Sequence, residues 1–425
     1  MNPSAVRRAL TGCALALTAA VVLAQPLPTA RPQDMGLSSE RLARIGSWIQ
    51  GEIDAKRIPG AVVLVARNGK VAYYEALGQQ DPASPRPMGR DSIFRIYSMT
   101  KPLVSVATMM MVEEGKLMLE APVARYIPSF ANVRVGVEKV DANGNKSLEL
   151  VAPRRPITLQ DLLRHTSGLT YGFFGESMVK KAYNDALVAL PPTTDNAEFA
   201  EALAKLPLHY QPGSTWDYSY STDVLGRVLE VVSGQSLSAV LKQRLLDPLG
   251  MKDTSFYVPE PARQARIAEP MPDDRSFGVN ANISDPRVVR NLESGGGGMV
   301  STADDYARFA QMLLNGGALD GKRYLSPKTL EFMTSDQLGA TVTKTALYLP
   351  GPGYGFGLGF ATRLTAGEAA SASAPGEYNW GGAGGTYFWV DPRTNLFVVF
   401  MMQSPKQRVI YRSVLRNMVY AAVER

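Results

Sequence analysis

A serine and a lysine three residues apart are the first candidates for covalent chemistry in this sequence, in the segment 98–101, Ser-Met-Thr-Lys. A serine hydroxyl is a poor nucleophile until a base takes its proton. Residues three apart on a helix share a face, so Lys101 can reach Ser98 if a helix begins here, and Pro102 suits a first helical turn. The apolar run 103–112 would partly bury the ammonium, which favours the neutral form that accepts a proton. A capped core helix would show the same residues, so the pair gains weight only from its partners.

Histidine, the usual base beside a catalytic serine, is scarce in this chain. His165 and His209 are its only histidines, and no G-x-S-x-G segment supplies the nucleophile elbow of the α/β-hydrolases. These two histidines and the single cysteine, Cys13, cannot form a cluster that holds Zn²⁺. The base must therefore be another residue, a zinc hydrolase is excluded, and we expect neither a metal nor a cofactor.

Two further segments offer groups that could assist such a serine. In 212–220 a Pro-Gly turn leads into a polar aromatic cluster that contains Tyr218, and a tyrosine near a lysine cation can share one proton with it. In 379–386, Asn-Trp-Gly-Gly-Ala-Gly-Gly-Thr, the glycines would let backbone approach a ligand at the edge of a strand. A tyrosine ring packed in a loop and a plain glycine-rich turn are the alternatives.

The elements that must position these groups begin with a helix and a hairpin near the N-terminus. After Ser38-Ser39-Glu40, apolar residues recur at helical spacing, at Leu42, Ile45, Ile49 and Ile53, and the pattern ends before Pro59-Gly60. The β-rich runs 61–66 and 71–77 follow, joined by 67–70, whose Asn-Gly pair suits a tight hairpin turn. A sheet therefore begins here.

The C-terminal quarter returns to strands, at 386–391 and 396–403, before a last helix from about 407 to 423. Between the two strand-rich ends, from about 100 to 314, helical patterns and loops dominate, with one hairpin around Asn143-Gly144. Ser301-x-x-Asp304 resembles a capping box at the start of a helix that ends at Gly316-Gly317. The pattern predicts one sheet built from both ends and a helical region inserted between them.

Residues 1–24 have the pattern of a secretory signal peptide. Arg7 and Arg8 precede the apolar run 9–23, and Val22-x-Ala24 fits a cleavage site. The run is shorter than the ~20 residues of a membrane span, and the alternative of a lipoprotein box at Cys13 is weak because the apolar run follows the cysteine. We therefore expect an exported protein, periplasmic or secreted, with no membrane span and no cysteine after cleavage.

The charge of the chain is modest and scattered. It carries 45 basic and 39 acidic residues, a net charge of +6, and loss of Arg7 and Arg8 would lower this to +4. Such a balance does not indicate a nucleic-acid partner. A small-molecule substrate remains the expected partner, and the oligomeric state stays open.

The three segments, in this order and spacing, resemble the serine β-lactamase and penicillin-recognising superfamily, in the class C-like branch that includes family VIII carboxylesterases. The segments 94–97, 165–169 and 295–302 match patterns of the same superfamily. The resemblance extends over about 33–425. It implies an α+β fold of the β-lactamase/transpeptidase type, in which an antiparallel sheet from both termini is flanked by helices. Its α/β part would be about 36–97 and 335–425, with a mostly helical part of about 98–334 and the site between them.

The resemblance also assigns roles to residues. It makes Ser98 the acylated nucleophile, Lys101 its proton acceptor and Tyr218 the relay of a proton to the leaving group, and it leaves open which base acts first. The backbone N–H groups of Ser98 and Ala383 would form the oxyanion hole. His165 would belong to a structural turn.

Departures from the family pattern bear on the substrate. Penicillin-active members have Lys-Thr-Gly where this chain has Trp380, Gly381 and Gly382, and Tyr-x-Asn where it has Tyr218-Ser219-Tyr220. The lost lysine removes a charge-assisted contact of about 1.5 to 3 kcal/mol, while the indole adds apolar surface. Tyr220, Trp380, Gly381 and Gly382 would then form a substrate-binding surface suited to esters.

The predicted function is therefore an exported serine hydrolase that cleaves carboxylic esters through an acyl-enzyme. A β-lactamase, or a D-amino-acid peptidase or amidase of the same fold, is the alternative within the superfamily, and weak β-lactam hydrolysis would be compatible with either. A non-catalytic penicillin-binding-like module is the alternative from another class.

Overall fold

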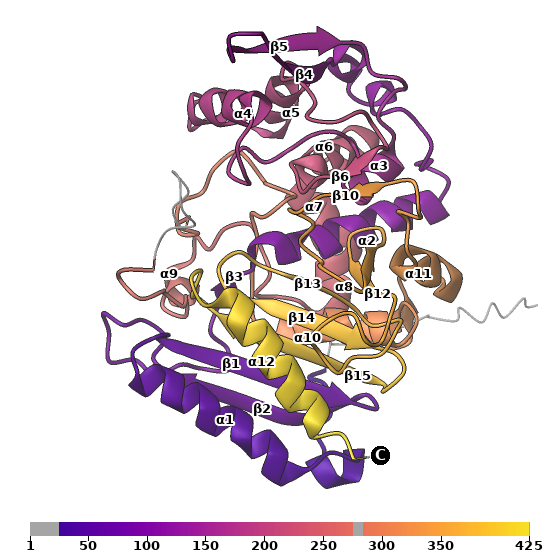
Figure 1. Ribbon diagram of the computed structural model, residues 1–425. Helices are drawn as coiled ribbons and strands as arrows, with labels where there is room; N and C mark the ends of the chain where they lie inside the picture. The colour runs from indigo at the N-terminus through magenta and orange to yellow at the C-terminus, as the bar shows by residue number, and fades with distance from the viewer. Residues whose placement is uncertain (1–24, 275–283, 425) are drawn as a thin grey trace, which may run out of the picture.

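A seven-stranded antiparallel sheet unites the two ends of the chain (Figure 1). The computed structural model describes residues 25–274 and 284–424, so the predicted signal peptide 1–24, with Cys13, lies outside the described residues. The strand order is β11-β12-β13-β14-β15-β1-β2. The bounds are β1 Gly60–Arg67, β2 Lys70–Gly78, β11 Tyr354–Phe356, β12 Ala361–Arg363, β13 Tyr378–Gly381, β14 Tyr387–Asp391 and β15 Leu396–Met402. The predicted shared sheet is confirmed.

The pairing of β1 with β15 joins the N-terminal and C-terminal parts, with Ala61 opposite Met402. Successive side chains of a strand point to opposite faces, and both faces of β1 are buried. Ala61, Val63 and Val65 enter one core, shared with α1 (Ser39–Asp54) and α12 (Arg408–Ala421). The alternate residues of β1 enter the larger core under the helical region. Two cores thus use one strand, which is why it is apolar throughout.

The predicted N-terminal helix and hairpin are present with their expected signals. Ser38 caps α1 by accepting a hydrogen bond from the backbone N–H of Arg41, and the stripe of the helix faces the sheet. Asn68 and Gly69 have φ angles of 52° and 75°, as a tight turn between β1 and β2 requires. These elements depend on short-range signals, which explains why they could be predicted.

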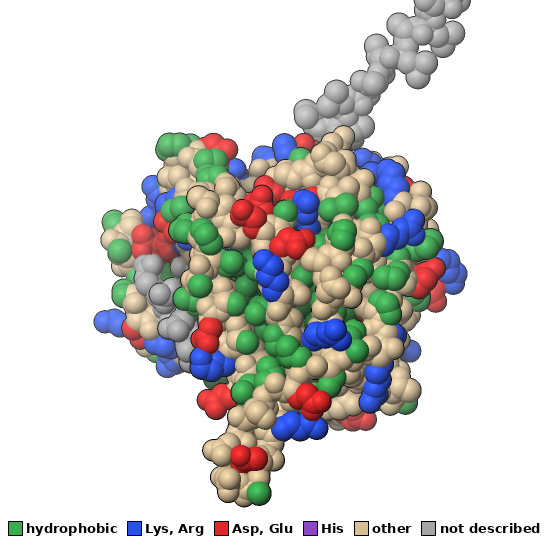
Figure 2. All heavy atoms as spheres, turned by 90° about the horizontal axis from the view of Figure 1, so that it is seen from above, with side chains coloured by type: hydrophobic (Ala, Val, Ile, Leu, Met, Phe, Trp, Pro, Cys, Tyr) green, Lys and Arg blue, Asp and Glu red, His purple; other side chains and the backbone are tan. Residues whose placement is uncertain are grey.

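The middle of the chain forms a mostly helical region above the sheet (Figure 1). Its helices are α2 Thr100–Glu113, α3 Leu159–Leu163, α4 Met178–Val188, α5 Asn196–Ala204, α6 Ser221–Ser233, α7 Leu237–Leu241, α8 Asp247–Leu249 and α9 Pro261–Gln264. The hairpin predicted around Asn143-Gly144 joins β4 (Val135–Val140) to β5 (Lys146–Val151). Seen from this end, Lys and Arg side chains are interspersed with Asp and Glu, so this face shows no basic stripe (Figure 2).

Short strand pairs tie the remaining segments together. They are β3 (Phe94–Arg95) with β7 (Val300–Ser301), β6 (Thr215–Trp216) with β10 (Thr343–Lys344), and β8 (Ala318–Leu319) with β9 (Lys322–Arg323). Among the described residues, no single helix is long and apolar enough to cross a membrane. Only the pair Ser221–Ser233 and Leu237–Leu249, bent by 79°, reaches that length and composition together.

Two details of the predicted organisation differ from the structure. The helix α10 (Ala303–Leu314) is capped by Thr302, which accepts from the N–H of Asp305, and not by Ser301, which pairs in β7 instead. Although α10 falls within the predicted helical part, it packs against β14 and β15 of the sheet. Its Tyr306 hydroxyl donates to the carbonyl of Met99, which links the sheet side to the segment of Ser98. A further helix, α11, spans Pro327–Thr334.

Asp305 generates a prediction about stability. Burial raises the pKa of its carboxyl to about 7, although hydrogen bonds from Thr254 and Asp253 oppose the shift. An unfolded aspartate titrates near ~3.9, so the native state holds a proton that the unfolded state has lost between these values. The stabilisation by this proton is fully present below the unfolded pKa and is lost as the pH rises through the folded one.

We therefore expect Asp305→Asn, which keeps a neutral acceptor oxygen, to gain thermal stability relative to wild type as the pH rises from about 5 to about 8. Calorimetric unfolding midpoints of the two proteins across that range provide the measurement. A difference in midpoint that stays constant, or that moves against the variant, contradicts the assignment.

Candidate active site

Ser98 lies at a strained junction between the sheet side and the helical region. It follows β3 within the 3-10 turn η2 (Tyr97–Met99), directly before α2, as the predicted helix start requires. Tyr97 has a φ of 43°, a left-handed conformation that costs a bulky residue energy and that concentrates at functional sites. Ser98 is half-buried and lines a cavity of about 380 Å³. The turn therefore presents the serine to this cavity.

Lys101 is buried in the first turn of α2, with 1% of its surface exposed. Its Nζ donates to the hydroxyl of Tyr171 at 3.0 Å and to the carbonyl of Gly296 at 2.6 Å. The ammonium also lies 4.5 Å from the ring centre of Tyr218. Among the described residues no hydrogen bond joins Lys101 to Ser98, and catalytic hydrogen bonds often tighten only with substrate. The structure thus brings Lys101 and Tyr218 together beside the serine.

Tyr218 lies just before α6 and is held through both its ring and its hydroxyl. The indole Nε1–H of Trp380, on β13, donates to the Tyr218 hydroxyl at 3.1 Å. The backbone carbonyl of Tyr218 accepts from the N–H of Tyr171, which fixes these two tyrosines relative to each other. Tyr218 is thus fixed by contacts with both Trp380 and Lys101.

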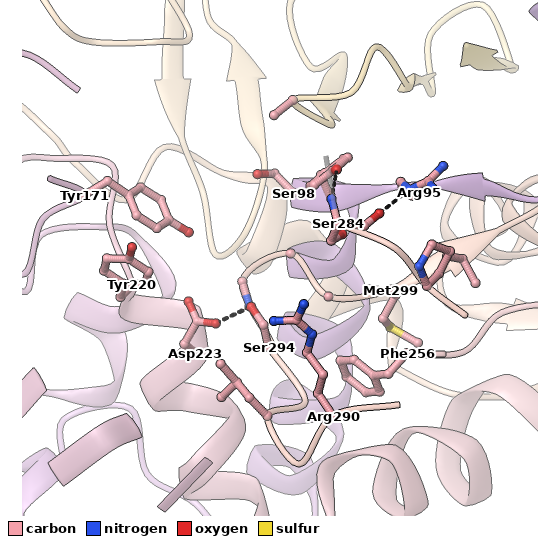
Figure 3. A pocket seen from close by; sticks show the side chains of 18 of the residues that line it. Arg95, Ser98, Tyr171, Tyr220, Asp223, Phe256, Ser284, Arg290, Ser294 and Met299 are labelled. Atoms are coloured by element: carbon pink, nitrogen blue, oxygen red, sulfur yellow. Dashed lines mark hydrogen bonds between the residues drawn. The ribbon is translucent and has the colours of Figure 1, made fainter. Parts of the chain in front are cut away.

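Asp223, in the first turn of α6, is a buried acid of this site that the sequence analysis did not select. Its Oδ1 accepts from the hydroxyl of Ser294 at 2.5 Å and from the N–H of Gly296 at 3.1 Å, and Figure 3 shows Ser294 beside it. Burial raises the pKa of Asp223, while the charge of Lys101 opposes the rise. One residue, Gly296, therefore bonds the ammonium through its carbonyl and the carboxyl group through its N–H.

Gly296 must be a glycine for this arrangement to form. A Cβ at this position would lie 2.2 Å from Oδ2 of Asp223, far inside contact distance. The glycine lets the backbone of the 295–298 segment approach both charged groups. The sequence showed this run of four glycines, but only as a match to a family pattern.

Tyr171 contacts Lys101 directly, and the sequence analysis did not select it. It is buried, and burial raises the pKa of its hydroxyl well above the usual value, with the charge of Asp223 adding to the effect. It therefore stays a neutral phenol that accepts from Lys101. Tyr171 follows the 165–169 motif by two residues, so its position near a family segment was the available signal. Asp223 offered less, because an acid in the first turn of a helix is common.

The loop between β13 and β14 brings Ala383 to the same cavity as Ser98. The N–H of Gly382 donates to the carbonyl of Thr386 at 2.8 Å, and the hydroxyl of Thr386 donates to the carbonyl of Ile96 at 3.3 Å. The loop is thereby attached to the segment that leads into Ser98. This places the two predicted oxyanion donors on one cavity.

The predicted substrate-binding residues separate into two groups. Tyr220 lines the cavity beside Tyr171, as Figure 3 shows, and Phe173, Phe174, Tyr218 and Phe256 contribute further rings to the lining. Trp380, Gly381 and Gly382 are not part of that lining. A Cβ on Gly382 would lie 2.4 Å from the carbonyl oxygen of Ile96, so this glycine serves close packing of the loop. Trp380 instead contacts Tyr218, through a hydrogen bond from its indole N–H.

Neither histidine is hydrogen-bonded to Ser98, Lys101 or Tyr218 among the described residues, although the ring of His165 packs 4.8 Å from that of Tyr218. His165 is buried, with Nδ1 3.2 Å from the hydroxyl of Ser219. Burial, assisted by the charge of Lys101, lowers its pKa well below the usual value, so the ring is neutral. His209 contacts the carboxylate of Asp217 at 2.8 Å.

Comparisons with known proteins agree with this fold. The family model described as Beta-lactamase matches residues 45–420, and the chain belongs to this family. Esterase EstB of Burkholderia gladioli is 32% identical over 404 residues, covering 89% of this chain and 95% of EstB. Lovastatin esterase of Penicillium rubens is 31% identical over 299 residues, covering 68% and 72%.

Among solved structures, EstCE1, a hydrolase with promiscuous acyltransferase activity, superposes with a TM-score of 0.75 and 30% identity over 90% of this chain and 99% of EstCE1. The resemblance and the fold predicted from the sequence are confirmed. These relatives support a serine hydrolase of the β-lactamase fold that acts on small-molecule esters or amides.

The position of Gly296 predicts that Gly296→Ala disrupts the site. The added methyl must displace the Asp223 carboxyl group, which breaks its bond from the Gly296 N–H and shifts the peptide segment whose carbonyl bonds Lys101, and we expect kcat for a hydrolysed ester to fall at least about tenfold. Steady-state kinetics on folded protein measure this. Gly51→Ala is the control, because a methyl there meets nothing within 4 Å. Unchanged kcat in Gly296→Ala contradicts the role given to this contact.

The bond from Trp380 to Tyr218 makes a separate prediction. Trp380→Phe keeps an aromatic ring but removes the N–H, and because leaving a buried polar partner unsatisfied costs about 1–3 kcal/mol, kcat should fall about 5- to 100-fold. Trp389→Phe is the matched control, since the indole nitrogen of Trp389 has no partner among the described residues. Equal kcat values for the two variants contradict the prediction.

Proposed function

We propose that this protein is an exported carboxylesterase of the family VIII type, with Ser98 as its nucleophile. The observation that carries the proposal is that Ser98 and Tyr218 line one aromatic cavity, with Lys101 buried against the ring of Tyr218 and an indole N–H on Tyr218 in place of a strand lysine. The esterase relatives support the same activity. Export rests on the signal-peptide pattern of residues 1–24.

The reaction would proceed in two steps. The Ser98 oxygen attacks the ester carbonyl while its proton passes to the Lys101–Tyr218 pair, and the N–H groups of Ser98 and Ala383 bind the oxyanion. The C–O bond to the alcohol then breaks, and the alcohol leaves with that proton. Water attacks the acyl-enzyme in the second step, gives a proton to the same pair, and releases the acid as Ser98 regains its hydrogen.

The surroundings of Lys101 fit the demands of this proton transfer. Tyr171 and Gly296 hold the ammonium in place over the ring of Tyr218. The N–H of Trp380 fixes the Tyr218 hydroxyl beside Lys101, so that this pair can accept the proton of Ser98. Tyr218 would then return the proton to the leaving alcohol.

The cavity favours apolar ester groups. Eight aromatic residues, with Leu292 and Met299, contribute to its walls, and the volume of about 380 Å³ suits a small or medium acyl group. The position of the strand lysine of penicillin-active relatives is occupied by Trp380, which is buried and bonded to Tyr218. The carboxylate of a β-lactam therefore lacks that partner, which favours esters.

The experiment that tests the proposal compares wild type with Ser98→Ala on a short-chain p-nitrophenyl ester, at matched concentrations of folded protein. We expect Ser98-dependent ester hydrolysis that falls at least about 10³-fold in the variant, because no other group supplies the nucleophile. Ser47→Ala, at an exposed serine of α1, is the matched control and should keep wild-type kcat.

A chromogenic cephalosporin and a D-alanyl-D-alanine peptide are assayed beside the ester. Ester turnover that survives in Ser98→Ala contradicts the mechanism. Faster Ser98-dependent cleavage of the cephalosporin or of the peptide favours a β-lactamase or a peptidase instead. No turnover of any substrate favours a recognition module.

A further inference from the structure

The carbonyl oxygen of Gly382 and the N–H of Ala383 belong to the same peptide unit. A peptide bond is planar, and no cis peptide occurs among the described residues, so these two groups point in opposite directions. Nη2 of Arg412, on α12, donates to the Gly382 carbonyl. The Ala383 N–H therefore faces away from Arg412, and Ala383 lines the cavity of Ser98.

We propose that Arg412 is a positioning residue that orients the Ala383 N–H of the oxyanion hole by holding the opposite end of the Gly382–Ala383 peptide. The inference rests on the proposed function, since an oxyanion hole serves acyl transfer. It assigns to Arg412, which lies about one turn along α12 from the cavity-lining Arg408 and does not itself line the cavity, a part in a step that occurs at Ser98.

Arg412 bonds both ends of the loop. The same Nη2 also donates to the carbonyl of Thr386 at 3.1 Å, and the guanidinium carbon lies 5.1 Å from the ring centre of Tyr387. Burial lowers the pKa of Arg412 to about 10, so the group remains charged at neutral pH. One side chain thus connects the last residue before Ala383 with the first residue after the glycines.

Gly381 makes this approach possible. A Cβ on Gly381 would lie 2.5 Å from the guanidinium carbon of Arg412. The glycine at position 381, which does not line the cavity, is therefore explained by the close approach of Arg412. A glycine that leaves room for a charged group is evidence that the close approach belongs to the fold.

The loop needs such a restraint because glycines surround Ala383. Gly382, Gly384 and Gly385 have more backbone freedom than other residues, and Gly385 adopts a φ of 118°. The turn bond from the N–H of Gly385 to the carbonyl of Gly382, at 3.2 Å, is a neutral contact. A bond from a guanidinium is about twice as strong as a neutral one.

The charge of Arg412 also acts on the donor itself. Hydrogen bonds along a chain polarise one another, so a cation on the carbonyl oxygen makes the N–H at the other end of the peptide a better donor. Loss of one N–H donor to the developing oxyanion lowers kcat about 10²- to 10³-fold. Misorientation, which weakens the bond without removing it, should cost less.

The test compares Arg412→Met and Arg412→Lys with wild type. We expect Arg412→Met to lower kcat about 10- to 100-fold with little change in KM. Arg412→Lys, which keeps a cation but lacks the planar fork, should recover part of the loss. Affinity for an aryl boronic acid, whose tetrahedral adduct on Ser98 places an oxygen in the oxyanion hole, should fall in parallel with kcat.

The matched control is Arg41→Met. Arg41 donates from α1 to the carbonyl of Ala421 at the other end of α12, so it is an arginine–carbonyl bond to the same helix remote from the cavity. This variant should keep wild-type kcat and boronic-acid affinity. Thermal unfolding of every variant shows which are folded. If Arg412→Met does not fold, the comparison of Arg412→Lys with wild type is the test.

The outcomes separate the two proposals. Folded Arg412 variants with wild-type kcat, or with raised KM and unchanged boronic-acid affinity, overturn the positioning role while Ser98-dependent esterase activity stands. Wild type without Ser98-dependent ester turnover overturns the proposed function, and with it the role of Arg412. Parallel losses of kcat and boronic-acid affinity, confined to Arg412, support the inference.

Discussion

The burial of a single ammonium, that of Lys101, is the constraint on which the rest of the site depends. A charge removed from water costs several kcal/mol unless polar groups replace its hydration. Here Tyr171 and Gly296 supply acceptor oxygens, Asp223 lies behind Gly296, and the ring of Tyr218 covers the ammonium. The groups that compensate for the burial of the ammonium also fix it beside the phenol of Tyr218. The same contacts therefore stabilise the fold and position the reacting groups.

The sheet meets the second requirement, which is to bring together groups from distant parts of the chain. Pairing of β1 with β15 joins the two ends, and β13 and β14 then carry the Ala383 loop to the turn that holds Ser98. On the outer face, α1 and α12 pack in one core, and this packing supports the helix that carries Arg412. The nucleophile and the oxyanion loop thus depend on opposite faces of one sheet.

Whether a feature was predicted correctly depended on how far apart in the sequence the residues that determine it lie. The hairpin at Asn68-Gly69 and the helix α1 depend on neighbouring residues and were predicted correctly. The cap of α10 was placed at Ser301, one residue early, because Ser301 pairs in a strand and leaves the cap to Thr302. Trp380 was interpreted as apolar surface for substrate, whereas its indole is buried and donates to the catalytic tyrosine candidate.

By itself the sequence determined the family, the shared sheet and the candidates Ser98, Lys101 and Tyr218, because short motifs and their order carry that information. Only the tertiary structure decided what surrounds Lys101 and what Trp380 and Arg412 hold. Those bonds join residues that are 70, 195, 162 and 30 positions apart in the chain. No local spacing or periodicity records such contacts, since they exist only after the sheet and the helical region have packed together.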